Sequence, residues 1–99
     1  MDVTLLYFDG CPNWQVADER LQEALARAGR DDVRVQRRLV STPEEAEAAR
    51  FRGSPTVLVD GRDPFADPAA PVGLSCRVYR TADGLAGSPT VDQLLAVLQ

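Results

Sequence analysis

The sequence predicts a single α/β domain over residues 1–99, with a four-stranded mixed sheet, the element order β-α-β-α-β-β-α and helices on both faces. Two observations lead to this fold class. Apolar runs of strand length alternate with segments of helical period over the first 60 residues, which is the pattern of βαβ units with a parallel strand pair. Two further predicted strands, at 56–59 and 77–81, then follow without a helical segment between them, which indicates an antiparallel hairpin.

The first half of the chain predicts two strands around a helix. Residues 3–8 are nearly continuous apolar sequence, as in a central strand that is buried on both faces. From Trp14 to Ala28 the apolar residues recur at spacings of three and four, which predicts one face of a helix that ends at Gly29. Residues 33–40 alternate between apolar and polar side chains, so this strand is expected near a sheet edge.

Two capping boxes predict the remaining helices. Thr42-Pro43-Glu44-Glu45 combines a capping threonine with proline at the first helical position and begins a short helix that ends near Phe51. Thr90 with Gln93 begins the last helix, whose inward positions are occupied by Val91, Leu94, Leu95 and Leu98.

The segment between the two late strands, residues 61–75, is long for a hairpin loop and rich in Gly, Pro, Ala and Asp. Either it is a flexible insertion, or it folds back as a lid with Phe65 and Leu74 as its anchors. Turn chemistry explains the acidic residues in and directly before this segment better than a cation site does, because their spacing fits no calcium loop. These residues are Asp60, Asp63 and Asp67.

The composition narrows the classes of function. The net charge of −4 argues against nucleic acid or an anionic membrane surface as the main partner, and no apolar run is long enough to span a membrane. The chain has no histidine, the commonest general base and transition-metal ligand, and we predict neither a cofactor nor a dedicated metal site. Two cysteines and no signal peptide predict a cytoplasmic protein, and the use of arginine without lysine suggests a bacterial source.

Two short segments carry the chemistry. In Phe8-Asp9-Gly10-Cys11-Pro12-Asn13-Trp14, a cysteine stands between a strand and a helix. In Gly53-Ser54-Pro55-Thr56, a proline opens a strand, and there a cis peptide bond is expected, with a trans loop proline as the alternative. The same Gly-Ser-Pro-Thr-Val pentapeptide recurs at residues 87–91, where it reads as the start of a helix.

These two segments resemble the thioredoxin-like superfamily, in particular its minimal glutaredoxin-like form. The chain also looks like small members with a GCPNW motif that are sometimes labelled alkylmercury lyase-like. The resemblance implies a thioredoxin-like fold, Cys11 as the nucleophile and Pro55 as the cis-proline. It implies a substrate-binding surface made of Pro12, Trp14, Ser54, Pro55 and Thr56. The chain departs from the pattern at Trp14, which occupies the position of the second motif cysteine.

The placement of Cys11 is suited to thiol chemistry. If Pro12 is the first helical residue, Cys11 is the N-cap, and its sulfur faces unpaired N–H groups and the positive end of the helix dipole. Both favour the thiolate, which is the reactive form. The alternative is a small buried hydrophobic residue that fills the junction. Trp14 lies on the apolar helix face and is expected to be a core aromatic, or else an apolar wall beside the nucleophile.

Cys76 is the remaining candidate for a second sulfur. In a regular hairpin it would lie about 13 Å down the strand from the edge that carries Cys11, whereas a disulfide needs Cα atoms within about 7 Å. It can reach Cys11 only if the 61–75 segment distorts the hairpin. We therefore expect a buried structural thiol, with a resolving thiol or a second soft-metal ligand as the alternative.

Three functions fit these residues. The favoured one is a monothiol redox protein in which Cys11 exchanges with a protein disulfide or a small thiol. The second is binding of a soft metal or an organomercurial by Cys11 and Cys76. The third is a non-catalytic module that grips a peptide or a sister chain around Trp14 and Pro55.

Overall fold

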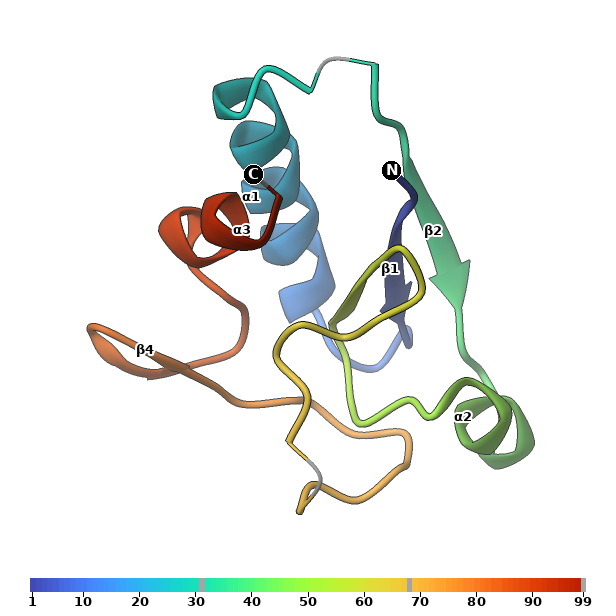
Figure 1. The fold of residues 1–99 in the computed structure, drawn as a ribbon. Helices are drawn as coiled ribbons and strands as arrows, with labels where there is room; N and C mark the ends of the chain where they lie inside the picture. The colour runs from blue at the N-terminus through green and yellow to red at the C-terminus, as the bar shows by residue number, and fades with distance from the viewer. Residues whose placement is uncertain (31, 68, 99) are drawn as a thin grey trace.

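The structure, a computed structural model, describes residues 1–30, 32–67 and 69–98. Its elements follow one another as β1 (Val3–Tyr7), α1 (Asn13–Arg27), β2 (Val35–Leu39), α2 (Pro43–Ala49), β3 (Thr56–Val59), β4 (Tyr79–Thr81), β5 (Gly84–Ala86) and α3 (Val91–Leu98) (Figure 1). No helix in these ranges is both long enough and apolar enough to cross a membrane.

The main sheet has three strands in the order β2-β1-β3. β1 lies in the centre, parallel to β2 and antiparallel to β3, so that Leu5 stands between Arg37 and Val57. Leu5 and Leu6 are both completely buried, which confirms the prediction of a central strand covered on both faces. The prediction of β2 as an edge strand is also confirmed.

The predicted four-stranded sheet is wrong. In the described residues β4 does not join β3 but pairs antiparallel with β5 in a separate two-stranded sheet, and this hairpin projects from the body of the molecule in Figure 1. The sequence analysis missed β5, although Asp83-Gly84 is a strong hairpin signal. Gly84 has a φ of +106°, which a tight turn of this kind can use.

A turn directly after β3 explains why the predicted β3–β4 hairpin does not form. Asp60 and Gly61 both have positive φ angles, 52° and 80°, which is the signature of a type I′ turn. The turn brings Arg62 back to Val59, and their backbones exchange hydrogen bonds of 2.8 and 3.1 Å. Arg62 thereby occupies the edge of β3 that the later strand would have needed.

Helices cover the two faces of the sheet unequally. α1 and α3 pack together on one face around a larger core, whose buried members are Val3, Leu5, Ala17, Leu21, Ala24, Leu25, Val57, Leu94 and Leu98. The other face carries a smaller core with α2, formed by Leu6, Val40, Ala46 and Phe51. Phe65 packs against the larger core and Leu74 against the smaller one, so the 61–75 segment folds back onto the sheet with the two anchors that the sequence predicts.

Local signals place the helix ends correctly. Thr42 caps α2 by accepting the Glu45 N–H at 3.1 Å. At α3 the capping box is complete, because Thr90 accepts from the Gln93 N–H at 3.1 Å and Gln93 accepts from the Thr90 N–H at 2.9 Å. Gly29 follows α1 with a φ of +70°, as expected for a helix stop.

Candidate functional site

Cys11 lies in the junction between β1 and α1. Its N–H donates to the Phe8 carbonyl at 3.3 Å, which closes the turn at the end of the strand. Pro12 is the N-cap and Asn13 the first helical residue, so Cys11 stands one residue before the cap and not at the cap as expected. Its side chain is completely buried, with 0 % exposure, so reagents in solution cannot reach this sulfur directly.

The structure brings Cys11 together with the Ser54-Pro55 junction. The Ser54–Pro55 peptide bond is cis, as the sequence predicts. The Cys11 thiol donates to the Ser54 carbonyl oxygen at a distance of 3.6 Å. Ser54, Pro55 and Thr56 are all buried, so two segments that are 43 residues apart form one packed unit.

Cys76 reaches the same place from the far side of the 61–75 segment. The Ser54 N–H donates to the Ser75 carbonyl at 2.7 Å, and the Arg77 N–H donates to the Ser54 carbonyl at 2.9 Å. This parallel bridge sets Cys76 beside Ser54, whose carbonyl also accepts from the Cys11 thiol, so both cysteines meet at the same residue. The distance of about 13 Å expected for a regular hairpin does not apply, because residues 75–77 do not belong to one.

The two thiols differ in exposure and are both unoxidised. Cys76 is exposed whereas Cys11 is buried, so the prediction of Cys76 as a buried structural thiol is also wrong. Hydrogen bonding to Cys11 raises the pKa of Cys76, and desolvation and the electrostatic interaction with Cys11 raise it further. Cys76 is thus the accessible sulfur of the pair and favours its protonated form, and Cys11 is the buried sulfur.

Two other residues of the predicted binding surface, at the start of α1, differ in burial. Trp14 is half-buried, stacks on Tyr7 with 4.3 Å between ring centroids, and packs against the larger core. This placement supports the interpretation of Trp14 as a core aromatic. Pro12 is exposed at the start of the helix.

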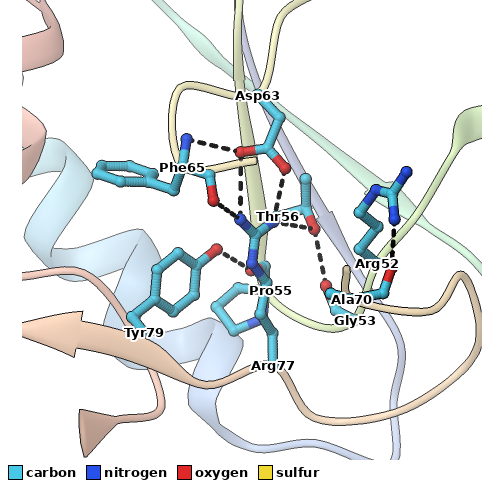
Figure 2. A network of polar contacts seen from close by, with 9 residues as sticks. All are labelled: Arg52, Gly53, Pro55, Thr56, Asp63, Phe65, Ala70, Arg77 and Tyr79. Atoms are coloured by element: carbon cyan, nitrogen blue, oxygen red, sulfur yellow. Dashed lines mark hydrogen bonds and ion pairs between the residues drawn. The ribbon is translucent and has the colours of Figure 1, made fainter. Parts of the chain in front are cut away.

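An ion pair that the sequence analysis missed anchors the segment carrying Cys76 (Figure 2). The Arg77 guanidinium lies 2.6 Å from the Asp63 carboxylate, and the side chain of Arg77 is only 7 % exposed. The same guanidinium donates to Thr56 Oγ1 at 3.3 Å and to the Phe65 carbonyl. Because Arg77 directly follows Cys76, these contacts hold the chain around Cys76 against β3 and against the 61–75 segment.

Tyr79 completes this anchor. Its ring lies 4.6 Å from the Arg77 guanidinium, and its hydroxyl donates to the Pro55 carbonyl. Burial raises the pKa of Tyr79 well above its usual range, although the Arg77 charge opposes the shift. The sequence held one signal for this anchor. Arg77 and Tyr79 are two residues apart, so in an extended segment they share a side, and a charged residue on the inward side needs a buried partner.

The acidic residues of the 61–75 segment act largely in turns. Asp63 Oδ1 accepts the Phe65 N–H at 2.9 Å, and Asp67 Oδ1 accepts the Ala69 N–H at 3.0 Å. Within residues 1–30, 32–67 and 69–98, no three His, Cys, Asp or Glu side chains gather as a potential metal centre. Any metal bound through the cysteines would therefore rely on two sulfur ligands.

A cavity of about 270 Å³ opens beside Cys76. Its walls are residues 75–78, four residues of the 61–75 segment (Phe65, Asp67, Ala70 and Pro71), and Arg52, which donates to the Ala70 carbonyl. The exposed sulfur thus faces a space in which a small molecule or a side chain could sit. No protein-family model, no curated protein and no solved structure matches this chain.

Proposed function

We propose that this protein carries out thiol–disulfide exchange with Cys11 and Cys76 as a redox pair. The observation that carries the proposal is that the two cysteines, which come from distant parts of the sequence, meet at Ser54. The Ser54 carbonyl accepts from the Cys11 thiol at 3.6 Å, and the Ser54 backbone forms a parallel bridge with Cys76. A disulfide bond can form only when the chain already brings the two residues together. The sequence-based expectation used only Cys11. The proposal uses both sulfurs, because Cys11 is buried and a substrate can reach only the exposed Cys76 directly.

The reaction starts at the accessible sulfur. Cys76 loses its proton and attacks one sulfur of a substrate disulfide, whose other sulfur leaves as a thiolate and is protonated by water. Cys11 then loses its proton and attacks the Cys76 sulfur, which expels the second substrate thiolate. The substrate disulfide is reduced to two thiols by two electrons, and the cysteine pair is oxidised to one disulfide. Two equivalents of a small thiol reverse the sequence and regenerate the pair.

The surroundings of the pair support this division of roles. Cys76 borders the cavity of about 270 Å³, so a small disulfide or a protein disulfide has access to it. The Ser54 carbonyl accepts from Cys11 and holds the second sulfur in the enclosed side of the pair. The motif resemblance to thioredoxin-like proteins supports the same chemistry for Cys11, with Cys76 in place of their second motif cysteine. A cytoplasmic location, where small thiols keep the pair reduced, is part of the proposal.

Reaction with a chromogenic aromatic disulfide tests the proposal. The wild-type chain is expected to release two equivalents of aromatic thiol and to end with an internal 11–76 disulfide and no adduct, as shown by mass spectrometry. Cys11→Ser should release one equivalent and keep the adduct on Cys76. Cys76→Ser should react slowly until it is unfolded, because Cys11 is buried. A wild-type chain that releases one equivalent and keeps a mixed disulfide would rule out the pair.

Soft-metal binding is a second candidate, favoured by the same placement of both cysteines at Ser54. Thiolates bind soft ions strongly, and two of them can hold an ion in linear coordination without a third ligand. We expect one mercuric ion per chain in the presence of a competing small thiol, lost in both Cys11→Ser and Cys76→Ser. Equal retention of mercury by wild-type and Cys76→Ser protein would exclude this candidate.

A further inference from the structure

A second cavity, of about 330 Å³, lies between the end of α2, the strand β3 and the turn that follows β3. Its lining contains neither cysteine. Three apolar residues, Ala49, Leu58 and Ala66, contribute to it, together with three arginines, Arg50, Arg52 and Arg62. The cavity therefore combines an apolar surface with cationic groups.

The charge around this cavity is opposite to that of the whole chain. The chain carries a net charge of −4, but the cavity lining has three guanidiniums and a single carboxylate, Asp63. That carboxylate is already engaged by Arg77 at 2.6 Å, so it does little to neutralise the arginines. A local excess of positive charge in an acidic protein attracts small anions.

Two of the arginines project from well-defined backbone positions. Arg50 is the C-cap of α2 in the left-handed conformation, with φ 52° and ψ 43°, where glycine is the preferred residue. Arg62 is fixed by its backbone bridge to Val59. Both residues are exposed, and neither side chain makes an ion pair or hydrogen bond within the part of the chain that the structure describes. Arg52 is held by its bond to the Ala70 carbonyl.

We propose that this cavity binds a small organic anion that has a carboxylate or phosphate head and an apolar body. The guanidinium group matches both heads through paired N–H donors, which a point charge such as lysine does not. The apolar part of the lining offers contact to a ring or a short alkyl chain. The volume of about 330 Å³ limits the ligand to the size of a small metabolite. This binding is independent of the redox pair, because neither cysteine lines the cavity.

Phenyl phosphate and benzoate are suitable probes, with benzyl alcohol as the uncharged control. Each is titrated into isotope-labelled full-length protein at constant ionic strength, and NMR follows the arginine side-chain N–H and the Leu58 methyl signals. We expect saturable shifts from at least one of the two anions and none from benzyl alcohol. The tighter anion identifies the head group, and either result supports the proposal.

Charge-matched variants separate this site from general attraction to arginine. The double variant Arg50→Gln/Arg62→Gln should weaken binding by at least about tenfold, which is about 1.4 kcal/mol, since it removes two charged donors. The double variant Arg34→Gln/Arg38→Gln, altered on and just before β2, should bind like wild type. Because all four side chains are exposed, the variants are expected to fold normally.

Arg50→Gly provides a second, independent check. Glycine suits the left-handed C-cap, so this variant should be folded and no less stable than wild type, yet it should bind the anion more weakly. The proposal is overturned if neither anion saturates, or if the Arg34/Arg38 pair matters as much as the Arg50/Arg62 pair.

Discussion

At the scale of single residues, the two cysteines owe their difference to what surrounds them. Cys11 is buried between the start of α1 and the Ser54 carbonyl, whereas Cys76 is exposed and lies on the other side of Ser54. Because Cys76 is exposed, a partner can reach its sulfur. The interaction with Cys11 raises the pKa of Cys76 and so disfavours its thiolate. The reactivity of the pair is therefore set jointly and belongs to neither residue alone.

Replacing Cys11 by alanine should make Cys76 easier to ionise. The change removes the hydrogen bond and the charge that raise the pKa of Cys76. The pH midpoint of Cys76 alkylation, above the ordinary value of about 8.5 in wild type, should fall toward that value in the variant. Alkylation rates measured by mass spectrometry between neutral and alkaline pH give both midpoints. An unchanged midpoint would show that Cys11 does not act on Cys76.

The same shift gives the stability of the wild-type protein a defined pH dependence. The pKa of Cys76 is higher in the folded chain than in the unfolded chain, so the thiol stabilises the fold at neutral pH, where it is protonated. This contribution should be lost as the pH rises through the pKa of Cys76 in the folded chain. Denaturant unfolding at neutral and alkaline pH should show a smaller loss in Cys11→Ala than in wild type.

Arg77 is the single charged side chain on which the position of Cys76 most depends. Arg77→Met should lower the free energy of unfolding by about 3 kcal/mol, because it leaves Asp63 without its buried partner. Arg27→Met is the matched control, since the Arg27–Glu23 pair is more than half exposed on each side and its loss should cost less than about 0.5 kcal/mol. Denaturant titration measures both. Similar losses in the two variants would contradict the anchoring role of Arg77.

At the scale of the elements, the decisive feature is the parallel bridge between residues 53–54 and 75–77. Gly53 makes this approach possible, because its φ is +113° and a Cβ on it would lie 3.0 Å from Arg77 Cβ and 3.1 Å from the Ser75 carbonyl oxygen. The bridge in turn sets Cys76 against Cys11. The short hairpin β4–β5 follows as a separate sheet and does not pair with β3 at the edge of the main sheet.

Gly53→Ala should therefore disrupt both stability and chemistry. We expect a loss of about 2–3 kcal/mol from the unfavourable φ and the crowding, together with slower formation of the 11–76 disulfide. Gly29→Ala is the control, because Gly29 also has a positive φ but a Cβ there would meet nothing within 4 Å. It should cost about 1 kcal/mol and leave the rate of disulfide formation unchanged. Equal disulfide rates in the two variants would contradict the role given to the bridge.

At the scale of the whole molecule, the cysteine pair lies where the β1–α1 junction meets the end of the 61–75 segment. Cys11 belongs to the β1–α1 junction, and Cys76 follows the segment that packs on both cores through Phe65 and Leu74. Oxidation would connect these regions covalently. The redox state of the pair should therefore affect the stability of the entire chain.

Oxidised protein should be more stable than reduced protein by up to about 4 kcal/mol, because a disulfide that closes a loop of this length restricts the unfolded chain. Urea unfolding with and without a reductant measures the difference. Cys76→Ser should unfold identically under both conditions. If oxidised wild-type protein were no more stable than reduced protein, the proposed 11–76 disulfide would be absent or strained.

The sequence by itself determined what depends on neighbours along the chain. The ends of α2 and α3 follow from Thr42 and Thr90, which satisfy N–H groups a few residues away. The buried central strand follows from the apolar run at residues 3–8, and the cis Ser54–Pro55 bond was expected from a proline at the start of a strand. Short-range hydrogen bonds and periodic burial can be predicted from the sequence, because the residues that make them are close together in the chain.

The tertiary structure alone decided where residues 75–77 lie, and with them the site. The path of the returning segment depends on the turn at Asp60-Gly61, on the packing of Phe65 and Leu74, and on the buried Arg77–Asp63 pair. These contacts join residues far apart in sequence, and no local pattern specifies which of several sheet edges a long segment will reach. The contact between Cys11 and Cys76 exists because that packing excludes the simpler hairpin.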